Sequence, residues 1–258
     1  MNQVSTQQLA DWLDNTLQTQ RFKDYCPNGL QVEGKPHIRH LITGVTATQA
    51  LLETAIAKQA DAILVHHGWF WKNESPVVRG TKRTRLALAL GHQLNVFAYH
   101  LPLDAHPTLG NNAQLAKVLG FEPELDADGQ PLRCGPDNLI WLGRCGEGKT
   151  LEELSDSICN RLQRTPLVVG NLQQKIRRIA WCTGGAQGMM QAAIDAGADA
   201  YLTGEASEPT YHLAQETGTA FIGAGHHATE RYWVQALGHA IAEQFGIRVD
   251  FVDIDNPI

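Results

Sequence analysis

Residues 38–68 read IRHLITGVTATQALLETAIAKQADAILVHHG, and they align without a gap on residues 176–206, IRRIAWCTGGAQGMMQAAIDAGADAYLTGEA. Nine positions are identical, including the Ala-Asp-Ala triplets at 60–62 and 198–200. Each copy contains a short apolar strand, a turn, an amphipathic helix and a second apolar strand, which predicts a β-α-β unit. Such units form parallel sheets that carry helices on their faces. The sequence therefore predicts an α/β fold of two pseudo-repeated lobes with mainly parallel sheets.

A weaker match extends the repeat beyond these segments. It aligns residues 84–104 with residues 210–230, and it pairs His100 with His226 and Asp104 with Glu230. This match predicts that both copies continue into a further strand and helix, with polar residues at the same place in each.

Two predicted helices precede the repeated units in the same way. Residues 5–18 and residues 150–163 both open with Ser or Thr before an amphipathic pattern, and these residues are typical helix N-caps. We expect the two lobes to cover residues 1–125 and 126–258. Residues 122–138 are rich in Pro, Gly and Asp and lack periodicity, which is typical of a linker.

Composition argues against several classes of protein. The chain has 258 residues, 43% of them hydrophobic, so it can bury a full core. Its formal net charge of −6 argues against a general attraction to nucleic acid or to an anionic membrane. No segment has the pattern of a membrane span or a secretory leader, so we expect a cytoplasmic protein. The five cysteines are scattered without a CxxC pair, and we expect them to be reduced.

Possible metal ligands follow two predicted strands of the first lobe. The strand DAILV ends directly in His66 and His67, and the strand NVFAY ends in His100, with Asp104 four residues later. Open α/β sheets place ligands at the carboxyl ends of their strands, which is where these residues lie.

The second lobe has a related motif. The strand AFIGA leads through a glycine to His226, and Glu230 follows one helical turn later. Residues spaced i, i+4 on a helix lie on the same face, so both side chains can approach one ligand. Three separate segments of the chain thus end in histidine and carboxylate groups.

This set of side chains favours a site for two metal ions. Adjacent side chains on a strand point apart, so His66 and His67 are expected to serve different ions. Two ions need a bridging carboxylate, which Glu230 or Asp104 can supply. Imidazole mixed with carboxylate suits zinc, iron, manganese, cobalt or nickel. We expect two divalent ions per chain, of undetermined identity, that acidify a shared water into a nucleophile.

These residues also have a structural interpretation. A lone histidine at a strand end is more often a hydrogen-bonded structural residue than a ligand. The adjacent pair His66 and His67, combined with HxxxE in the second lobe, favours the metal site instead. Other histidines lie in polar surroundings and are expected at the surface, namely His37, His40, His92, His212 and His239.

Three further segments have open interpretations. The basic run VVRGTKRTR (77–85), with Arg79, Lys82, Arg83 and Arg85, could bind a substrate phosphate or form a solvated helix face. The loop CTGGAQG (182–188) could cradle a phosphate, although the aligned segment of the first lobe lacks its glycines. The aromatic cluster Trp69, Phe70 and Trp71 could line a pocket or stack on a base, but core or subunit packing is the favoured explanation.

Several of these motifs together resemble one protein family. The segments are DYCPNGLQVEG (24–34), DAILVHHGWFW (61–71), HLPLDAHPTLGNN (100–112), TGEASE (203–208) and GAGHHATER (223–231). They are similar to those of the Nif-three-like proteins, also labelled GTP cyclohydrolase type 2 homologues, and specifically to the short bacterial form. The resemblance implies a duplicated α/β fold with a dinuclear metal centre between the lobes. It also implies toroidal homo-hexamers, built as trimers of dimers, with the sites facing an internal cavity.

The resemblance also implies a distribution of ligands. His66 and His226 would bind one ion, His67 and Asp104 the other, and Glu230 would bridge them. His100 would be a neighbouring acid/base group. The family label does not define the reaction.

Two hypotheses of different classes follow for the function. The first is a metal-dependent hydrolase that acts on an electrophilic carbon or phosphorus of a small, nucleotide-like substrate, with His100 moving protons. The alternative is a non-catalytic metal-binding ring or scaffold protein. A ring around DNA is disfavoured by the net charge of −6.

Overall fold

The structure, a computed structural model, describes residues 2–258. Within this range the chain forms two compact units. The first contains the residues up to His106 together with Trp233–Asp255, and the second contains Pro107–Tyr232 together with Asn256–Ile258. The boundary falls inside helix α9 (His226–Phe245). Across residues 2–258, none of the helices is long and apolar enough to cross a membrane.

The first unit is built on a five-stranded sheet in the order β14-β4-β5-β6-β2. Neighbouring strands from β14 to β6 are parallel, and only β2 runs antiparallel to its neighbour in this sheet. The strands are β2 (Gly29–Val32), β4 (His40–Thr46), β5 (Ala62–His67), β6 (Asn95–Ala98) and β14 (Arg248–Phe251). A separate antiparallel pair consists of β1 (Val4–Ser5) and β3 (His37–Ile38). The parallel arrangement predicted for the first repeat is confirmed.

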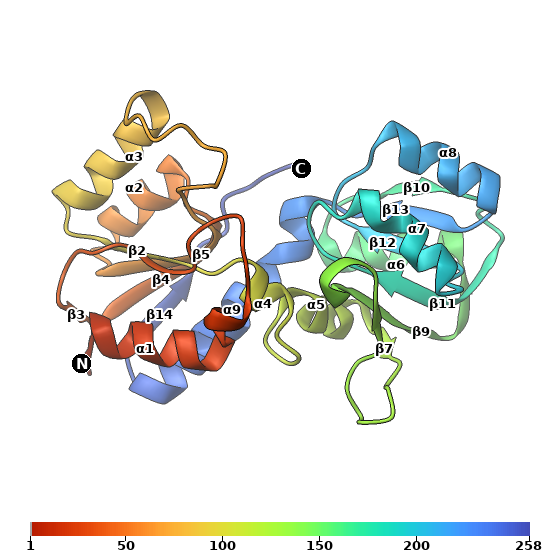
Figure 1. The fold of residues 1–258 in the computed structure, drawn as a ribbon, viewed down its shortest axis with the longest axis horizontal. Coiled ribbons are helices and arrows are strands. Elements are labelled where there is room, and N and C mark those ends of the chain that lie inside the picture. Colours follow the sequence, from red (N-terminus) through yellow and green to blue (C-terminus); the bar gives the residue numbers. More distant parts are fainter. Residues whose placement is uncertain (1) are drawn as a thin grey trace. The chain divides into compact units, whose positions relative to one another are not determined.

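Helices cover both faces of this sheet. The helices of this unit, apart from α9, are α1 (Thr6–Leu17), α2 (Gln49–Ala57), α3 (Gly80–Gly91) and the short α4 (Leu101–Asp104). In Figure 1, α2 and α3 lie on one side of the sheet and α1 lies on the other. Leu51 and Leu52 of α2 are fully buried against Ile42, Ile63 and Val96 of the sheet. Burial of these aliphatic side chains fixes β5 and β6 in the sheet. His66 and His67 end β5, and His100 lies two residues after the end of β6.

The second unit contains a seven-stranded sheet of mixed direction. Its main path is β10-β13-β12-β11-β9-β7, and β8 also pairs with β9. The central strands β11, β12 and β13 are parallel, as predicted for the second repeat. The other pairings in this sheet are antiparallel, so the prediction of a mainly parallel sheet is wrong for this unit. The strands are β7 (Glu122–Pro123), β8 (Arg133–Cys134), β9 (Ile140–Thr150), β10 (Leu167–Val169), β11 (Lys175–Trp181), β12 (Ala200–Thr203) and β13 (Ala220–Gly223). The linker predicted at residues 122–138 is wrong, because β7 and β8 lie in that segment and pair with β9.

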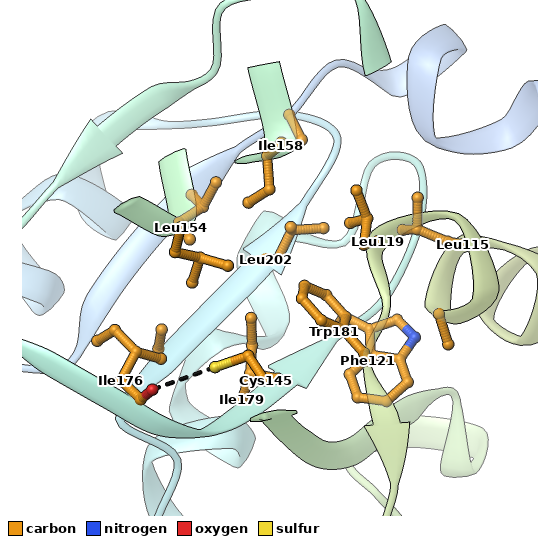
Figure 2. Packing of buried hydrophobic residues seen from close by; sticks show 14 of the residues in the cluster. Leu115, Leu119, Phe121, Cys145, Leu154, Ile158, Ile176, Ile179, Trp181 and Leu202 are labelled. Carbon is orange, nitrogen blue, oxygen red and sulfur yellow. Dashed lines mark hydrogen bonds between the residues drawn. The ribbon is translucent and has the colours of Figure 1, made fainter. Parts of the chain in front are cut away.

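The core of the second unit lies between this sheet and two helices. The unit's helices, apart from α9, are α5 (Asn111–Leu119), α6 (Leu151–Leu162), α7 (Met190–Asp195) and α8 (Glu208–Thr217). Figure 2 shows Leu115 of α5 and Leu154 of α6 packed with Trp181 and Leu202 of the sheet. In the same core, Cys145 Sγ donates to the carbonyl of Ile176 at 3.1 Å, so this thiol is structural.

The predicted helix caps are confirmed. Ser5 and Gln8 form a capping box at the start of α1, and Thr150 and Glu153 form one at the start of α6. In each box the hydroxyl accepts the backbone N–H of the third helical residue, and that residue's side chain accepts the N–H of the cap. These local hydrogen bonds explain why both helix starts were predictable from sequence.

An aspartate links neighbouring strands in the same way in each unit. In the first unit Oδ2 of Asp61 accepts the backbone N–H groups of Arg39 and His40 at 2.8 and 3.2 Å. In the second unit Oδ2 of Asp199 accepts those of Arg177 and Arg178, both at 2.9 Å. These aspartates belong to the two aligned Ala-Asp-Ala triplets.

Strand pairing corrects the weaker part of the sequence alignment. Ala62 lies opposite Asn95 in the first unit, and Ala200 lies opposite Ala220 in the second. If Ala62 corresponds to Ala200, Asn95 corresponds to Ala220 and His100 corresponds to Gly225. The predicted pairing of His100 with His226 is therefore wrong by one residue.

Candidate metal centre

Two adjacent histidines end strand β5. His66 is fully buried, and its Nδ1 donates to the carbonyl of Tyr99 at 2.9 Å. Nδ1 of His67 lies 3.3 Å from the hydroxyl of Thr46 on the neighbouring strand. The two rings have centroids only 4.6 Å apart. The expectation that their side chains diverge is thus wrong for this strand end.

His100 joins this pair from the next strand. It follows β6, and its ring centroid lies 5.0 Å from that of His66. One ligand atom of each of His66, His67 and His100 can be chosen so that all three lie within 4.8 Å of one another. Such a group can hold one metal ion.

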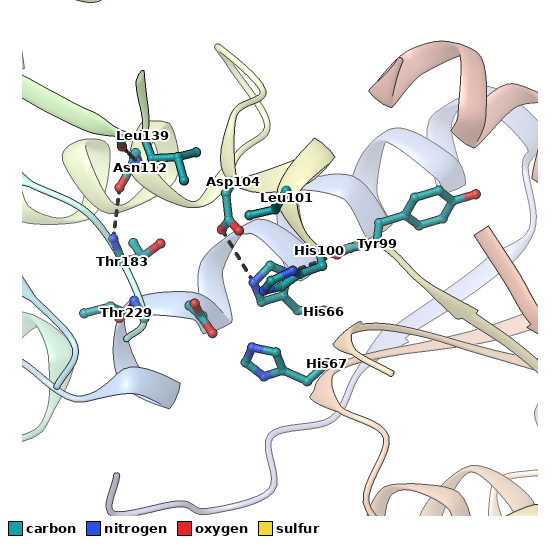
Figure 3. Close-up of polar contacts among 12 residues, drawn as sticks. His66, His67, Tyr99, His100, Leu101, Asp104, Asn112, Leu139, Thr183 and Thr229 are labelled. Carbon is teal, nitrogen blue, oxygen red and sulfur yellow. Dashed lines mark hydrogen bonds and ion pairs between the residues drawn. The ribbon is translucent and has the colours of Figure 1, made fainter. Parts of the chain in front are cut away.

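Asp104 adds a carboxylate to the first unit. It ends the single turn of α4, and its Oδ1 lies 3.5 Å from Nε2 of His66. Figure 3 shows this contact, with the imidazoles of His67 and His100 beside it. The first unit therefore brings together the residues predicted from its sequence: His66, His67, His100 and Asp104.

Asp24 holds His100 in position. Nδ1 of His100 donates to Oδ1 of Asp24 at 2.7 Å, and Oδ2 accepts the backbone N–H of Leu101 at 2.8 Å. The backbone N–H of His100 donates to Oδ1 of Asn28 at 2.7 Å. Burial alone would raise the pKa of Asp24, but hydrogen bonds from His100 and Asn28 and the charge of His100 lower it to about 2. The buried carboxylate of Asp24 thus fixes the orientation of the His100 ring through Nδ1.

The second unit supplies a histidine and two carboxylates. His226 is the first residue of α9, and its Nε2 lies 3.2 Å from Oε2 of Glu230, one turn along the helix. Nδ1 of His226 donates to Oε1 of Glu205 at 2.7 Å. Burial lowers the pKa of His226, but the hydrogen bonds and charges of Glu230 and Glu205 raise it to about 9. Three polar side chains therefore share one small region of this unit.

A glycine loop packs against His226 and Glu230. Gly184 has a φ of 69°, and a Cβ at this position would collide with Oε1 of Glu230 and lie 3.1 Å from Nε2 of His226. The N–H of Gly184 donates to Thr229 Oγ1 at 3.1 Å, and that of Ala186 donates to Thr203 Oγ1 at 3.2 Å. Two backbone N–H groups of the predicted phosphate-binding loop are thus already hydrogen-bonded to side chains of the protein. The glycine allows close approach to the carboxylate.

The donor chemistry fits divalent metal ions. In all four histidines Nδ1 contacts a backbone carbonyl, a hydroxyl or a carboxylate, so Nε2 is the nitrogen presented to a ligand. This arrangement is common around metal-binding histidines, because the second hydrogen bond fixes the tautomer and the ring orientation. Imidazole nitrogen with carboxylate oxygen suits zinc, iron, manganese, cobalt or nickel.

Sequence reasoning missed the partners of two histidines. Glu205 occupies the position aligned with His67 in the repeat, and this correspondence was the signal that could have singled it out. Asp24 lies 76 positions from His100 along the chain, and no spacing pattern links the two residues. His40, predicted at the surface, is instead buried, and its Nε2 lies 2.9 Å from Oδ2 of Asp250.

The basic and aromatic segments have separate roles. Nζ of Lys82 lies 2.9 Å from the carbonyl of Ser75 and 3.4 Å from Oε1 of Glu74, so its ammonium group binds the preceding loop. Trp69 is buried and donates to the carbonyl of Ala47 at 2.9 Å, which confirms the core explanation for this ring. Trp71 is only half-buried, and its ring centroid lies 5.1 Å from that of His100.

The fold and these donor groups define an α/β protein with candidate metal-binding clusters. Comparison with known proteins then identifies the family: the family model of Duf34/NIF3 (NGG1p interacting factor 3) matches residues 4–257, and the chain belongs to this family.

Similar proteins cover essentially the whole chain. A Neisseria meningitidis serogroup B protein named GTP cyclohydrolase 1 type 2 homolog is 56% identical, over 98% of this chain and 99% of its own length. A Pseudomonas aeruginosa protein of the same name is 51% identical, over 98% and 99%. The solved structure of protein ybgI, described as of unknown function, has a TM-score of 0.92 at 44% identity and covers 99% of this chain and 100% of its own. A Thermus thermophilus protein, TTHA1606, has a TM-score of 0.85 at 31% identity and covers 99% and 100%.

Proposed function

We propose that the donor groups of the two units act together on two divalent metal ions. His66 and His226 would bind one ion, His67 and Asp104 the other, and Glu230 would bridge the pair. The pairing of a histidine Nε2 with a carboxylate in each unit supports this proposal, at 3.5 Å for His66 and Asp104 and at 3.2 Å for His226 and Glu230. The number of ions is part of the proposal, and so is their identity among zinc, iron, manganese, cobalt and nickel.

The site would serve a metal-dependent hydrolase that acts on a small, nucleotide-like substrate. Two bound ions would supply Lewis acidity for water activation and for polarising an electrophilic carbon or phosphorus. The nucleotide-like substrate class is supported by the name that relatives carry, GTP cyclohydrolase 1 type 2 homolog.

His100 would hold and move the proton in this reaction. Its Nδ1 is bound to Asp24 at 2.7 Å, so Nε2 is the atom that would exchange a proton with water or substrate. Asp24 would keep the ring in that orientation, as a carboxylate does for a general-base histidine. The contact between Asp24 and His100 is the observation that carries the proton-transfer role, because it orients Nε2 of a histidine that is not among the proposed metal ligands.

A turnover screen tests the hydrolase proposal. Tag-free protein would be loaded with each of the five candidate metals and offered nucleoside phosphates, cyclic nucleotides and phosphate esters. We expect hydrolysis of at least one class, and we expect His100→Ala to reduce it by roughly 100-fold or more while metal content is unchanged. A loaded wild-type protein that turns over no member of the panel would support the non-catalytic metal-binding scaffold instead.

We also propose the larger organisation that the sequence predicted. The two lobes, residues 1–125 and 126–258, would be copies of one ancestral unit, which the matching hydrogen bonds of Asp61 and Asp199 support. Homo-hexamers are proposed from the family resemblance. Light scattering tests the assembly, and a monomer at micromolar concentration would contradict it.

A further inference from the structure

Two aromatic rings flank His100 without belonging to the core. The Trp71 ring centroid lies 5.1 Å from the His100 ring at an interplanar angle of 84°, and 6.1 Å from the His67 ring. The Tyr25 ring centroid lies 6.5 Å from the His100 ring. Tyr25 is 59% exposed and Trp71 is half-buried, whereas neighbouring Trp69 is 5% exposed. These two rings thus present apolar surface to solvent beside a polar cluster.

The loop that carries Trp71 is held by a defined set of contacts. Oε2 of Glu74 accepts the backbone N–H groups of Phe70 and Trp71 at 3.0 and 3.3 Å. Lys82 lies 3.4 Å from Oε1 of Glu74, and its ammonium group lies 5.4 Å from the centroid of the Phe70 ring. Phe70 has a φ of 66°, which a bulky residue rarely adopts. The contacts hold the loop in this unusual conformation, which sets the direction of Trp71.

The loop that carries Tyr25 is joined to the first. The backbone N–H of Lys72 donates to the carbonyl of Tyr25 at 2.7 Å. Asp24 accepts the N–H of Tyr25 at 2.6 Å and the side-chain amide of Asn28 at 2.9 Å, and it also holds His100. The backbone segments that carry both rings are therefore fixed in advance around one imidazole, which favours a binding subsite.

We propose that Trp71 and Tyr25 form a subsite for a planar aromatic heterocycle of nucleobase size. The ring faces would stack on the heterocycle, and its polar edge would face the imidazoles of His67 and His100. Stacking of bases on aromatic side chains is favourable for every base, because each base has a π-face. This inference rests on the proposed function, since it assigns the base-binding part of that site.

Binding of two matched probes tests the subsite. Guanosine 5′-monophosphate and ribose 5-phosphate share the sugar and phosphate and differ in the base. The chain has six tryptophans, so the Trp71 indole signal in a ¹⁵N spectrum can be assigned as the one missing from Trp71→Phe. We expect guanosine 5′-monophosphate to shift this signal saturably and to bind at least about tenfold more tightly than ribose 5-phosphate.

Substitutions distinguish the subsite from an exposed aromatic patch. Trp71→Leu and Tyr25→Leu should each weaken binding of guanosine 5′-monophosphate by about tenfold, and Trp71→Phe should retain most of it. Tyr211→Leu is the matched control, because Tyr211 is 51% exposed and packs beside His212 with ring centroids 5.5 Å apart. It should bind like wild type. Equal binding of the two probes, or wild-type affinity in both leucine variants, would overturn the subsite.

Metal analysis of the same samples separates this inference from the proposed function. Wild-type protein that holds metal but does not prefer the base-containing probe overturns the subsite alone. Wild-type protein that holds no metal overturns the proposed metal centre. In that case, a base preference that Trp71→Leu removes would still support the aromatic subsite.

Discussion

Nδ1 of His226 lies 2.7 Å from Oε1 of Glu205, while Nε2 of the same ring lies 3.2 Å from Oε2 of Glu230. The two ring nitrogens thus meet different carboxylates, one from the loop after β12 and one from the same helix. A carboxylate behind a histidine makes the opposite nitrogen a better metal donor and fixes its direction. Glu205 is therefore a positioning residue for the proposed metal centre.

Glu205→Gln should weaken metal binding without removing a ligand. The amide keeps the size of the side chain but lacks the charge, so we expect a loss of roughly 10- to 100-fold in affinity. Calorimetric titration of metal-stripped protein with Zn²⁺ measures this. Glu208→Gln is the control, because Glu208 is 88% exposed and lies 3.9 Å from His212. Equal affinity in both variants would show that Glu205 does not position His226.

Gly184→Ala should damage the same region through the backbone. The φ of 69° strains any residue with a Cβ by about 1–2 kcal/mol, and the added carbon would collide with Glu230. We expect a lower melting temperature and weaker metal binding. Gly188 lies in the same segment, and a Cβ added there would have no neighbour within 4 Å. Gly188→Ala should therefore have a melting temperature and metal affinity close to those of the wild type. Similar melting temperatures for the two variants would argue against close packing of the loop on Glu230.

Asp24 should make stability depend on pH in the acidic range. Its pKa is lowered from 3.8 to about 2, so its stabilising contribution is present above pH 3.8 and is lost as the pH falls through 2. The shift corresponds to about 2 kcal/mol. Urea unfolding should show Asp24→Asn less stable than wild type at pH 5, with the difference shrinking toward pH 2. A difference independent of pH would contradict the lowered pKa.

The sequence was sufficient to predict the parts of the fold that depend on local pattern. The helix starts at Ser5 and Thr150 were predictable because each cap contacts a residue three positions later. The parallel strands before His66 and His226 followed from apolar runs of the right length. Because histidines follow these predicted strands in the sequence, the candidate ligands of each unit could be located from the strand predictions.

The remaining features depend on contacts between distant residues. Glu205 lies 21 positions from His226, and Asp24 lies 76 positions from His100, so only folding brings each pair together. The segment at 122–138 forms strands because β9 offers it a partner, which its own composition does not reveal. The one-residue error in pairing His100 with a second-lobe position arose because a four-residue strand carries too little pattern to fix register.

The central claim is that the two units share a bridged pair of metal ions. Elemental analysis of tag-free protein, wild type and Glu230→Ala, tests it most directly. We expect about two ions per wild-type chain and a fall toward zero in the variant, because both ions would lose the bridging carboxylate. One ion or none in the wild type, unchanged by the substitution, would contradict the bridged centre.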